Sequence, residues 1–249
     1  MANVIKTFGI TANASLKTMG AGIARASVKT WNGKDAVAAS YLPSDNPTSL
    51  IAWFRTGVGI TESGGFASAW ADQSGNGNNL LQATGTNQPA YSAGVLTFDG
   101  IDNFMATAGF TFTQPGQLSI LVNMVSWTSA RYMTDGDSSE DDFALQQSGS
   151  TPNVRLVAGN AASSLATTQI TVGSYHVVSA MFNGASSSIK VDSNSVITGT
   201  VTSGGIGGFA LGSRGAGGLN TNIEVKEIIL RNVNDATIRA NDHAYLQTL

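Results

Sequence analysis

The sequence predicts an all-β protein with one helix at its C-terminal end. Short apolar runs recur along residues 49–230 with Gly, Asn, Ser or Pro between them, which is typical of short strands joined by turns. Strands do not alternate with helical patterns, so a parallel nucleotide-binding sheet is not expected. Charged residues make up only 12% of the chain, about half the usual share, which disfavours a helical protein built from Glu, Lys and Leu.

The apolar runs indicate where the strands lie. Residues 118–122 form a nearly continuous apolar run, as in a strand covered on both faces, whereas residues 188–192 alternate, as in a strand with one wet face. Many short strands of this kind predict a sandwich or a barrel. The expected strands are 49–54, 95–98, 117–127, 143–147, 153–157, 175–182, 188–192, 209–212 and 223–230.

A helix is expected after the last strand. Asn234 or Asp235 can cap its N-terminus, because a short polar side chain there accepts a hydrogen bond from a free amide. About fourteen residues would be marginal alone, so we expect an apolar stripe to hold the helix on the sheet. The stripe comprises Ile238, Tyr245, Leu246 and Leu249.

The first forty residues differ from the rest in charge and pattern. They hold five basic residues and one acid, whereas residues 41–249 hold eight basic and fifteen acidic residues. Three units read aliphatic, Lys, Thr, large apolar and then Gly, which suits short strands with turns between them. We predict an arm over residues 1–40, a linker over 41–48 and a domain over 49–249. The predicted partner-anchoring residues are Lys6, Phe8, Lys17, Met19, Lys29 and Trp31.

Such an arm needs a surface supplied by something else. Ordering one residue costs about 1–2 kcal/mol, and burying a large apolar side chain returns about 1.5–3 kcal/mol, so six anchors cannot order forty residues. The arm either packs on its own domain or docks on a partner assembly. Nucleic acid is not the expected partner, because the arm lacks Arg clusters and interleaved aromatic residues.

Several motifs resemble a known family. Trp53, the run WADQSGNGNNL at residues 70–80, QPAY at 88–91 and LTFDGIDNF at 96–104 resemble the opening of concanavalin A-like (LamG-type) jelly-roll domains. Residues 175–192, 208–212 and 223–249 resemble the later hairpin, strand and closing helix of that family. This resemblance covers residues 48–249 and implies a two-sheet antiparallel jelly-roll sandwich. The Lys-Thr repeats resemble leaders of bacteriophage structural proteins that carry such domains.

The motif residues have physical roles whatever the family. Asp72 and Asn76 can accept or donate hydrogen bonds in a turn, and Gly75 and Gly77 can take a positive φ. Asp99 and Asp102 flank Gly100 in the same manner. Core packing is the simplest role for Trp53, Trp70 and Phe98, and an exposed sugar-stacking platform is the alternative for the two Trp residues.

The sequence predicts no catalytic residues. Jelly-roll glucanases, which this architecture resembles, place E-x-D-x-E on one strand, and no such triplet occurs here. Glu224 and Glu227 are separated by an odd number of positions, so on a regular strand their side chains face opposite ways. His176 is expected within a strand and His243 on the last helix, neither with a partner at useful spacing.

No cofactor is expected, with calcium as the alternative. The chain has no Cys, which excludes disulfides and thiolate metal sites. Residues 135–142 begin like a calcium loop, but Glu140 stands where such a loop needs Gly, and Gln146 stands where it needs a bidentate Glu. The Gly-rich residues 204–208 open no helix, so a phosphate loop is not expected there.

The resemblances, taken with the basic arm, imply a non-enzymatic bacteriophage virion structural protein that displays a lectin-like domain: a capsid decoration, head-fibre or tail-associated subunit anchored through residues 1–40. Its expected partners are other virion proteins and, by resemblance, copies of itself in a trimer. No apolar window is long enough to span a membrane and no signal peptide is evident, so we expect synthesis in the host cytoplasm and a place on the virion surface. The alternatives are a carbohydrate-binding module for host surface glycans and a glycan-cleaving enzyme.

Overall fold

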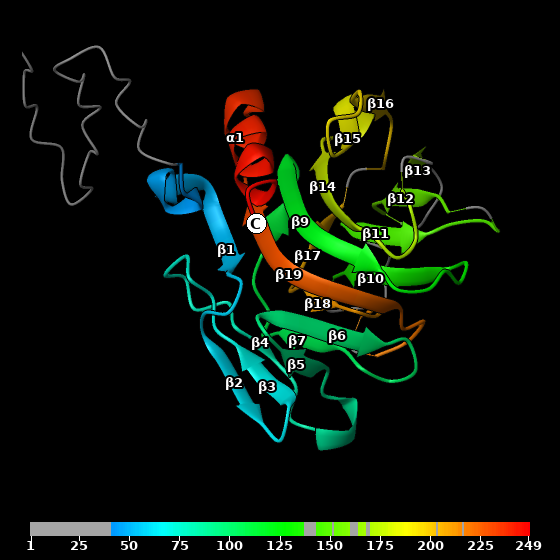
Figure 1. Cartoon of the computed structure of the whole chain (residues 1–249). Helices are drawn as coiled ribbons and strands as arrows, with labels where there is room; N and C mark the ends of the chain where they lie inside the picture. The colour runs from blue at the N-terminus through cyan, green and yellow to red at the C-terminus, as the bar shows by residue number, and fades with distance from the viewer. Residues whose placement is uncertain are drawn as a thin grey trace, which may run out of the picture. The chain divides into compact units, whose positions relative to one another are not determined.

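A computed structural model describes residues 41–136, 143–150, 152–159, 164–167, 170–202, 204–215 and 217–249. The six predicted anchoring residues of the arm lie outside this range, so their roles stay predictions. Within the described residues the protein is mostly β-structure with one short α-helix at its C-terminal end, which confirms the predicted class (Figure 1). No helix of the described residues is long and apolar enough to cross a membrane.

The strands are short except for β9, β14 and β19. All nine predicted strands are present, with ends that differ by a few residues at most. The strands are β1 (Leu50–Phe54), β2 (Ile60–Ser63), β3 (Phe66–Trp70), β4 (Leu80–Leu81), β5 (Ala90–Ser92), β6 (Val95–Asp99), β7 (Met105–Thr107), β8 (Phe112–Thr113), β9 (Gly116–Met124), β10 (Arg131–Asp135), β11 (Ala144–Gln147), β12 (Val154–Val157), β13 (Ser164–Thr167), β14 (Tyr175–Phe182), β15 (Ser187–Val191), β16 (Ile197–Gly199), β17 (Gly205–Ile206), β18 (Ala210–Leu211) and β19 (Asn222–Arg231).

Every strand pair among the described residues is antiparallel, and hydrogen bonds connect seventeen of the strands into one large sheet. One run of this sheet follows the order β1, β19, β9, β14, β15 and β16. A second run follows the order β13, β12, β11, β10, β18, β7, β4, β3 and β2. Strands β5 and β6 connect the two runs, since β6 pairs with β19 and β5 reaches β3.

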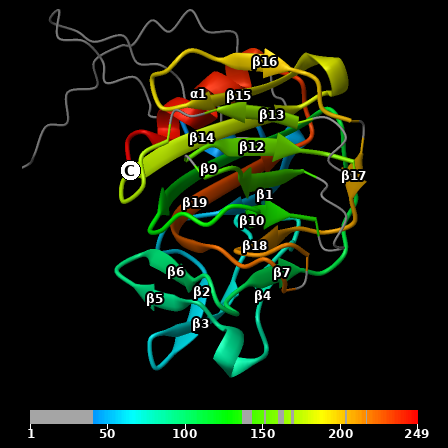
Figure 2. The same ribbon diagram turned by 90° about the vertical axis from the view of Figure 1, so that its right-hand side faces the viewer.

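The main hydrophobic core uses side chains from both runs. Ile120 and Val178 come from the first run, and Leu145, Leu156 and Leu211 come from the second. A smaller cluster lies on the other face of the first run, beneath helix α1 (Ala236–Leu246). Figures 1 and 2 show α1 on the side of β9 and β14 away from β11 and β12. All nine residues of β9 are buried, as predicted for a strand covered on both faces.

Helix α1 begins where the sequence predicted and packs on the sheet through a face that is part apolar and part polar. Asp235 is the N-cap, and its carboxylate accepts hydrogen bonds from the Thr237 and Ile238 amides at 2.8 and 3.0 Å. The predicted apolar stripe is wrong in part, because Leu249 is 47% exposed and lies beyond the helix. Leu246 is buried in the cluster beneath the helix and Tyr245 packs against it, as the stripe predicts, while two buried polar residues share this face. That face comprises Asp242, His243 and Leu246.

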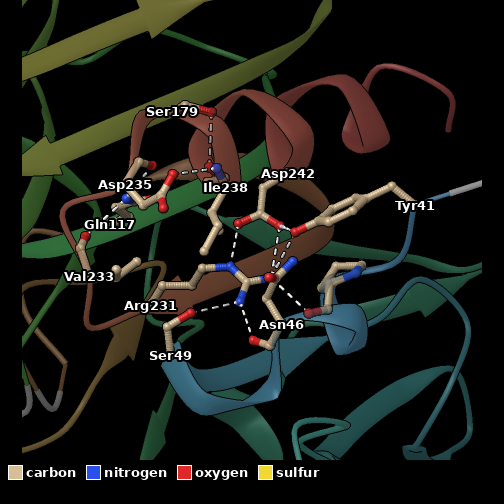
Figure 3. Close-up of polar contacts among 12 residues, drawn as sticks. Tyr41, Asn46, Ser49, Gln117, Ser179, Arg231, Val233, Asp235, Ile238 and Asp242 are labelled. Carbon is tan, nitrogen blue, oxygen red and sulfur yellow. Dashed lines mark hydrogen bonds and ion pairs between the residues drawn. The ribbon is translucent and has the colours of Figure 1, made fainter. Parts of the chain in front are cut away.

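A buried ion pair joins α1 to β19 and to the segment before β1 (Figure 3). The Arg231 guanidinium is fully buried and donates from Nε to Asp242 Oδ2 at 2.5 Å and from Nη2 to Oδ1 at 3.0 Å. The Tyr41 hydroxyl donates to the same carboxylate at 2.6 Å. Arg231 also donates to the Pro43 and Asn46 carbonyl oxygens, each at 2.8 Å. Two 3₁₀ turns, η1 (Pro43–Asp45) and η2 (Pro47–Ser49), are therefore fixed to the end of β19.

Candidate functional site

Three polar residues lie side by side across β14, β9 and β19. Tyr175 is opposite Asn123, and Asn123 is opposite Glu224. Residues directly opposite one another in an antiparallel sheet project from the same face, so these side chains form a line across three strands. The three side chains project from the face of the sheet on which α1 lies. The contacts of α1 are with other residues of these strands. We call Tyr175, Asn123 and Glu224 the polar row.

The polar row is hydrogen-bonded internally through one carboxylate oxygen. The Tyr175 hydroxyl donates to Glu224 Oε2 at 2.8 Å, and Asn123 Nδ2 donates to the same oxygen at 3.0 Å. The Lys226 ammonium lies 4.3 Å from the centroid of the Tyr175 ring, a cation–π contact. The row thus combines a half-buried carboxylate, an aromatic ring and a cation at the surface.

Tyr175 acts as a neutral donor. Burial raises the pKa of its phenol well above the ordinary value of 10, and the hydrogen bond to Glu224 and the charge of that carboxylate raise it further. The phenol therefore keeps its proton at every physiological pH. It positions the carboxylate and offers its ring, but it does not become a phenolate nucleophile.

Asn123 brings an unused acceptor to the row. Its Nδ2 is committed to Glu224, which fixes the orientation of the amide, because the reverse orientation would set two oxygens against each other. Its Oδ1 is buried and has no hydrogen-bond partner among the described residues. Leaving a buried acceptor unpaired costs about 1–3 kcal/mol. This oxygen has almost no solvent-exposed surface, so the groups of the row that a ligand can reach are the Glu224 carboxylate and the Tyr175 ring.

The prediction that Glu224 and Glu227 face opposite ways is wrong. The register of β19 against β9 shifts between Val225 and Glu227, which is a β-bulge. Glu224 is opposite Asn123 and Glu227 is opposite Leu121. Positions 121 and 123 are two apart on β9 and share a face, so both glutamates project from that same face. The extra residue in β19 is the physical reason for the difference.

Glu227 nevertheless has no free access to a ligand. Its side chain is fully buried, and its Oε1 accepts hydrogen bonds from Trp53 Nε1 at 2.6 Å and from the Tyr245 hydroxyl at 2.7 Å. Its Oε2 accepts from the Thr56 amide at 3.1 Å. Burial and the Glu227 carboxylate raise the pKa of Tyr245 well above 10, so that hydroxyl remains a donor. Of the two glutamates, only Glu224 reaches solvent.

The WADQSGNGNNL motif serves the fold rather than a ligand. The Asp72 carboxylate accepts hydrogen bonds from the backbone amides of Trp53, Ser74 and Asn78 at 2.8 to 3.1 Å. Asn76 Nδ2 donates to the Leu50 carbonyl oxygen at 2.7 Å. The predicted turn roles of Asp72 and Asn76 are confirmed, since the loop fastens itself to the edge of β1.

The two glycines of this loop behave as predicted, with φ of 91° at Gly75 and 77° at Gly77. The second motif has a similar turn, in which Asp99 Oδ1 accepts from the Ile101 amide at 2.8 Å. Gly100 has φ of 77°, and a Cβ there would come within 2.9 Å of the Asn222 backbone. The second side chain of this turn is Asn103 rather than Asp102, because Asn103 Oδ1 accepts a hydrogen bond from the Asp99 amide at 3.2 Å.

The large aromatic residues named from the sequence pack inside the protein. Trp53 is 4% exposed, and Trp70 and Phe98 are buried as deeply or deeper. Core packing is therefore confirmed, and neither Trp is a sugar-stacking platform. Tyr175, which sequence reasoning did not single out, is a half-buried aromatic residue beside a carboxylate that is itself half-buried. Only the pairing of strands fifty residues apart brings it there.

Both histidines contact Asp192, which has a positive φ of 49°. The Thr171 amide donates to His176 Nε2 at 2.9 Å, so Nδ1 donates to the Asp192 carboxylate at 2.6 Å. His243 Nε2 donates to the Asp192 carbonyl oxygen at 2.7 Å, so its Nδ1 accepts from the Ser179 hydroxyl at 2.8 Å. The predicted strand and helix positions are confirmed, but the expected lack of partners is wrong, since the partners are distant in sequence.

We expect His243 to make the protein less stable in acid. Burial lowers the pKa of its imidazole, with Lys190 adding to this effect and Asp192 opposing it. The unfolded chain takes up a proton near pH 6.5, where the folded protein does not. The contribution of the neutral His243 imidazole to the free energy of unfolding is therefore complete above about pH 6.5 and is lost as the pH falls below it. Urea unfolding of His243→Gln should show a flatter pH dependence than the parent, and an unchanged slope would exclude His243 as the source.

The acidic segment considered for calcium is only partly described. Asp135 is buried, and its Oδ2 accepts from the Gly215 amide at 3.1 Å, while residues 137–142, Glu140 among them, lie outside the described range. Gln146 is buried in β11 and accepts a hydrogen bond from Arg155. Within the described residues, no group of three His, Asp or Glu side chains is placed to hold a metal ion.

Comparison with known proteins gives matches of structure alone. No family model matches this chain, and no curated protein matches it. A Trypanosoma rangeli sialidase in complex with sialic acid is similar, with a TM-score of 0.57 and 14% identity. An arabinofuranosidase complexed with arabinofuranosyl-alpha-1,2-xylobiose is similar at a TM-score of 0.58 and 14% identity. At this identity the matches establish a shared fold.

The matches are to parts of larger proteins. The aligned region covers 81% of this chain and 33% of the sialidase, and 73% of this chain and 50% of the arabinofuranosidase. They overturn the prediction of a non-enzymatic bacteriophage virion protein, because the matched structures are glycan-cleaving enzymes by name. The prediction that the chain is not an enzyme is contradicted by the same finding. The inference had relied on short Lys-Thr repeats in residues 1–40, which no match supports.

Proposed function

We propose that residues 49–249 form a concanavalin A-like jelly-roll sandwich that binds carbohydrate at the polar row. The two runs of antiparallel strands, with the main core between them, support the sandwich. The motifs at residues 70–80 and 96–104 support the family resemblance, since each forms a turn that holds strands in place. The matched region covers a third of one glycosidase and half of another, which fits a carbohydrate-related module within a larger architecture.

The observation that carries this proposal is the half-buried Glu224 carboxylate beside the Tyr175 ring, with an Oε1 that accepts no hydrogen bond within the described residues. Sugars bind to sites that combine a few convergent polar groups with an aromatic surface. Hydroxyl groups donate to carboxylate and amide oxygens, while the C–H faces of the sugar ring pack against an aromatic ring. The polar row offers both kinds of contact over three adjacent strands. Lys226 covers the Tyr175 ring on a flexible stem that can move aside for a ligand.

Replacement of Tyr175 tests the proposal. We expect Tyr175→Ala to weaken glycan binding at least tenfold, because it removes the ring and the donor that positions Glu224. The measurement is titration calorimetry of the whole protein with a glycan selected from an array. Phe66→Ala is the matched control, since Phe66 is 50% exposed on β3 and has no part in the polar row. Equal binding by both variants would place any glycan site elsewhere.

Glycan cleavage is a second candidate function, and one observation favours it. The bulge in β19 places Glu224 and Glu227 on one face, and most glycosidases use a pair of carboxyl groups. Glu227 already accepts hydrogen bonds from three donors, which opposes a direct role for this residue in cleavage. Release of reducing sugar from a polysaccharide panel would establish cleavage, and the roles of the two glutamates can then be separated by substitution.

A further inference from the structure

We propose that Asn76 is a site of spontaneous deamidation, and that this change loosens the loop of residues 72–79 from the edge of β1. Deamidation is easiest where glycine follows asparagine, because glycine has no Cβ to hinder attack by its backbone nitrogen on the side-chain amide. Two such pairs lie within the described residues, Asn76–Gly77 and Asn183–Gly184. Their surroundings differ, so the inference concerns one of them.

The two pairs differ at the glycine nitrogen, which is the nucleophile of the reaction. The Gly77 amide donates no hydrogen bond within the described residues, and both Asn76 and Gly77 are exposed. The Gly184 amide donates to Gln114 Oε1 at 2.7 Å in a half-buried turn. A Cβ at either glycine would meet nothing within 4 Å, so steric room does not distinguish the pairs. The hydrogen bond does, since the nitrogen must lose its proton to attack.

The reaction balances with water as its only co-reactant. The Gly77 nitrogen loses its proton and bonds to Asn76 Cγ, and the Cγ–Nδ2 bond breaks so that Nδ2 leaves as ammonia with one proton gained. The five-membered succinimide that results takes up water at one of its two carbonyl carbons and opens to aspartate or isoaspartate. The product therefore carries a carboxylate where the chain had an amide, and it has lost two N–H donors.

Those donors hold the loop to β1. Asn76 Nδ2 lies 2.7 Å from the Leu50 carbonyl oxygen and 3.1 Å from that of Ile51. A carboxylate there would place its oxygens against two carbonyl oxygens with no hydrogen between them. Asn78 Nδ2 and Ser74 Oγ still donate to the Ile51 carbonyl oxygen at 2.9 and 3.2 Å. We therefore expect the loop to loosen from β1 rather than to detach from it.

The same contacts hold the nitrogen that must leave, and this opposes the reaction at Asn76. The side chain of Asn183 caps no turn and donates no hydrogen bond within the described residues. If the leaving nitrogen decided the order, Asn183 would react first. We expect the glycine amide to decide it instead, because Asn76 is exposed and its side chain can turn away from β1, whereas the Gly184 amide stays bonded within a half-buried turn.

Peptide mapping tests the site. The whole protein is incubated at alkaline pH, and the conversion of each amide to an acid is followed by mass spectrometry. We expect deamidation at Asn76 to be about tenfold faster than at Asn183, the rate ratio that one hydrogen bond supplies. Gln114→Ala removes the acceptor of the Gly184 amide and should raise the rate at Asn183 alone. Equal rates in the parent, a faster Asn183 or no reaction at Asn76 would overturn the inference.

Asn76→Asp tests the consequence, since it carries the side chain of one product. The Trp53 amide donates to Asp72 Oδ1 at 2.9 Å, so its hydrogen exchange reports whether the loop holds β1. We expect this exchange to be about tenfold faster in Asn76→Asp than in the parent. Asn79→Asp is the matched control, because it adds the same charge to the same loop and keeps an acceptor for the Asp72 amide. Equal exchange in the two variants would overturn the loosening.

Discussion

Asp242→Ala should lower the free energy of unfolding by about 3–5 kcal/mol, because it removes one partner of a buried ion pair. Arg231 would remain fully buried with its charge uncompensated, and the Tyr41 hydroxyl would lose its acceptor. In the parent protein, burial, then the hydrogen bond and charge of Asp242, raise the pKa of Tyr41 well above 10, so this hydroxyl stays protonated and donates to Asp242. Urea unfolding followed by fluorescence gives the measurement.

Two further variants give this prediction its controls. Asp242→Asn keeps the volume and one acceptor oxygen but sets an amide N–H₂ toward the guanidinium, so we expect an intermediate loss. Asp102→Ala removes an exposed carboxylate in the turn after β6 and should change stability by less than about 0.5 kcal/mol. A loss below about 1 kcal/mol for Asp242→Ala would mean that the ion pair does not hold α1 to β19.

The long strands could be predicted because their own residues decide them. Residues 118–122 are apolar on both faces, and the structure buries both faces of β9 between the core and α1. The cap of α1 was predictable as well, since an N-cap depends on one local side chain. Short strands such as β2 and β16 were missed, because none of their residues is buried and they leave no apolar period in the sequence.

The polar row could not be predicted, for a physical reason. Tyr175, Asn123 and Glu224 are 49 to 101 positions apart, and only the order of β14, β9 and β19 makes them neighbours. Odd spacing correctly implies opposite faces on a regular strand, but a bulge adds one residue and reverses that conclusion. No residue in the sequence of β19 marks the bulge, so the shared face of Glu224 and Glu227 appears only with strand register.

The polar face of α1 shows the same limitation. Tyr245 and Leu246 pack on the sheet as the apolar stripe predicts, yet α1 is also held by Asp242 and His243. The partners of these two residues lie on β19, on β14 and just after β15. A polar contact between distant elements is stabilising only when both partners are buried together. Sequence patterns record the apolar members of an interface, and they omit pairs that become favourable only after the fold has formed.

Glu227→Gln should cost about 2–4 kcal/mol of stability, whereas Glu224→Gln should cost less than about 1 kcal/mol. Gln at 227 keeps one acceptor oxygen for Trp53 Nε1 and the Tyr245 hydroxyl, but its N–H₂ would face the Thr56 amide, so two buried donors would meet. Glu224 is half-buried, and Gln there keeps one acceptor oxygen for Tyr175 and Asn123. Thermal and urea unfolding of the two variants measure the difference.

The same pair of variants decides between binding and cleavage. If the chain only binds sugars, Glu227→Gln keeps the parent's glycan affinity wherever it is folded, because the side chain at 227 is fully buried. If the chain cleaves glycans with both glutamates, each variant loses turnover by several orders of magnitude at temperatures where it remains folded. Loss of turnover in Glu224→Gln alone would assign the chemistry to the polar row. Glu227 would then be the buried support that fixes Trp53 and Tyr245 beside it.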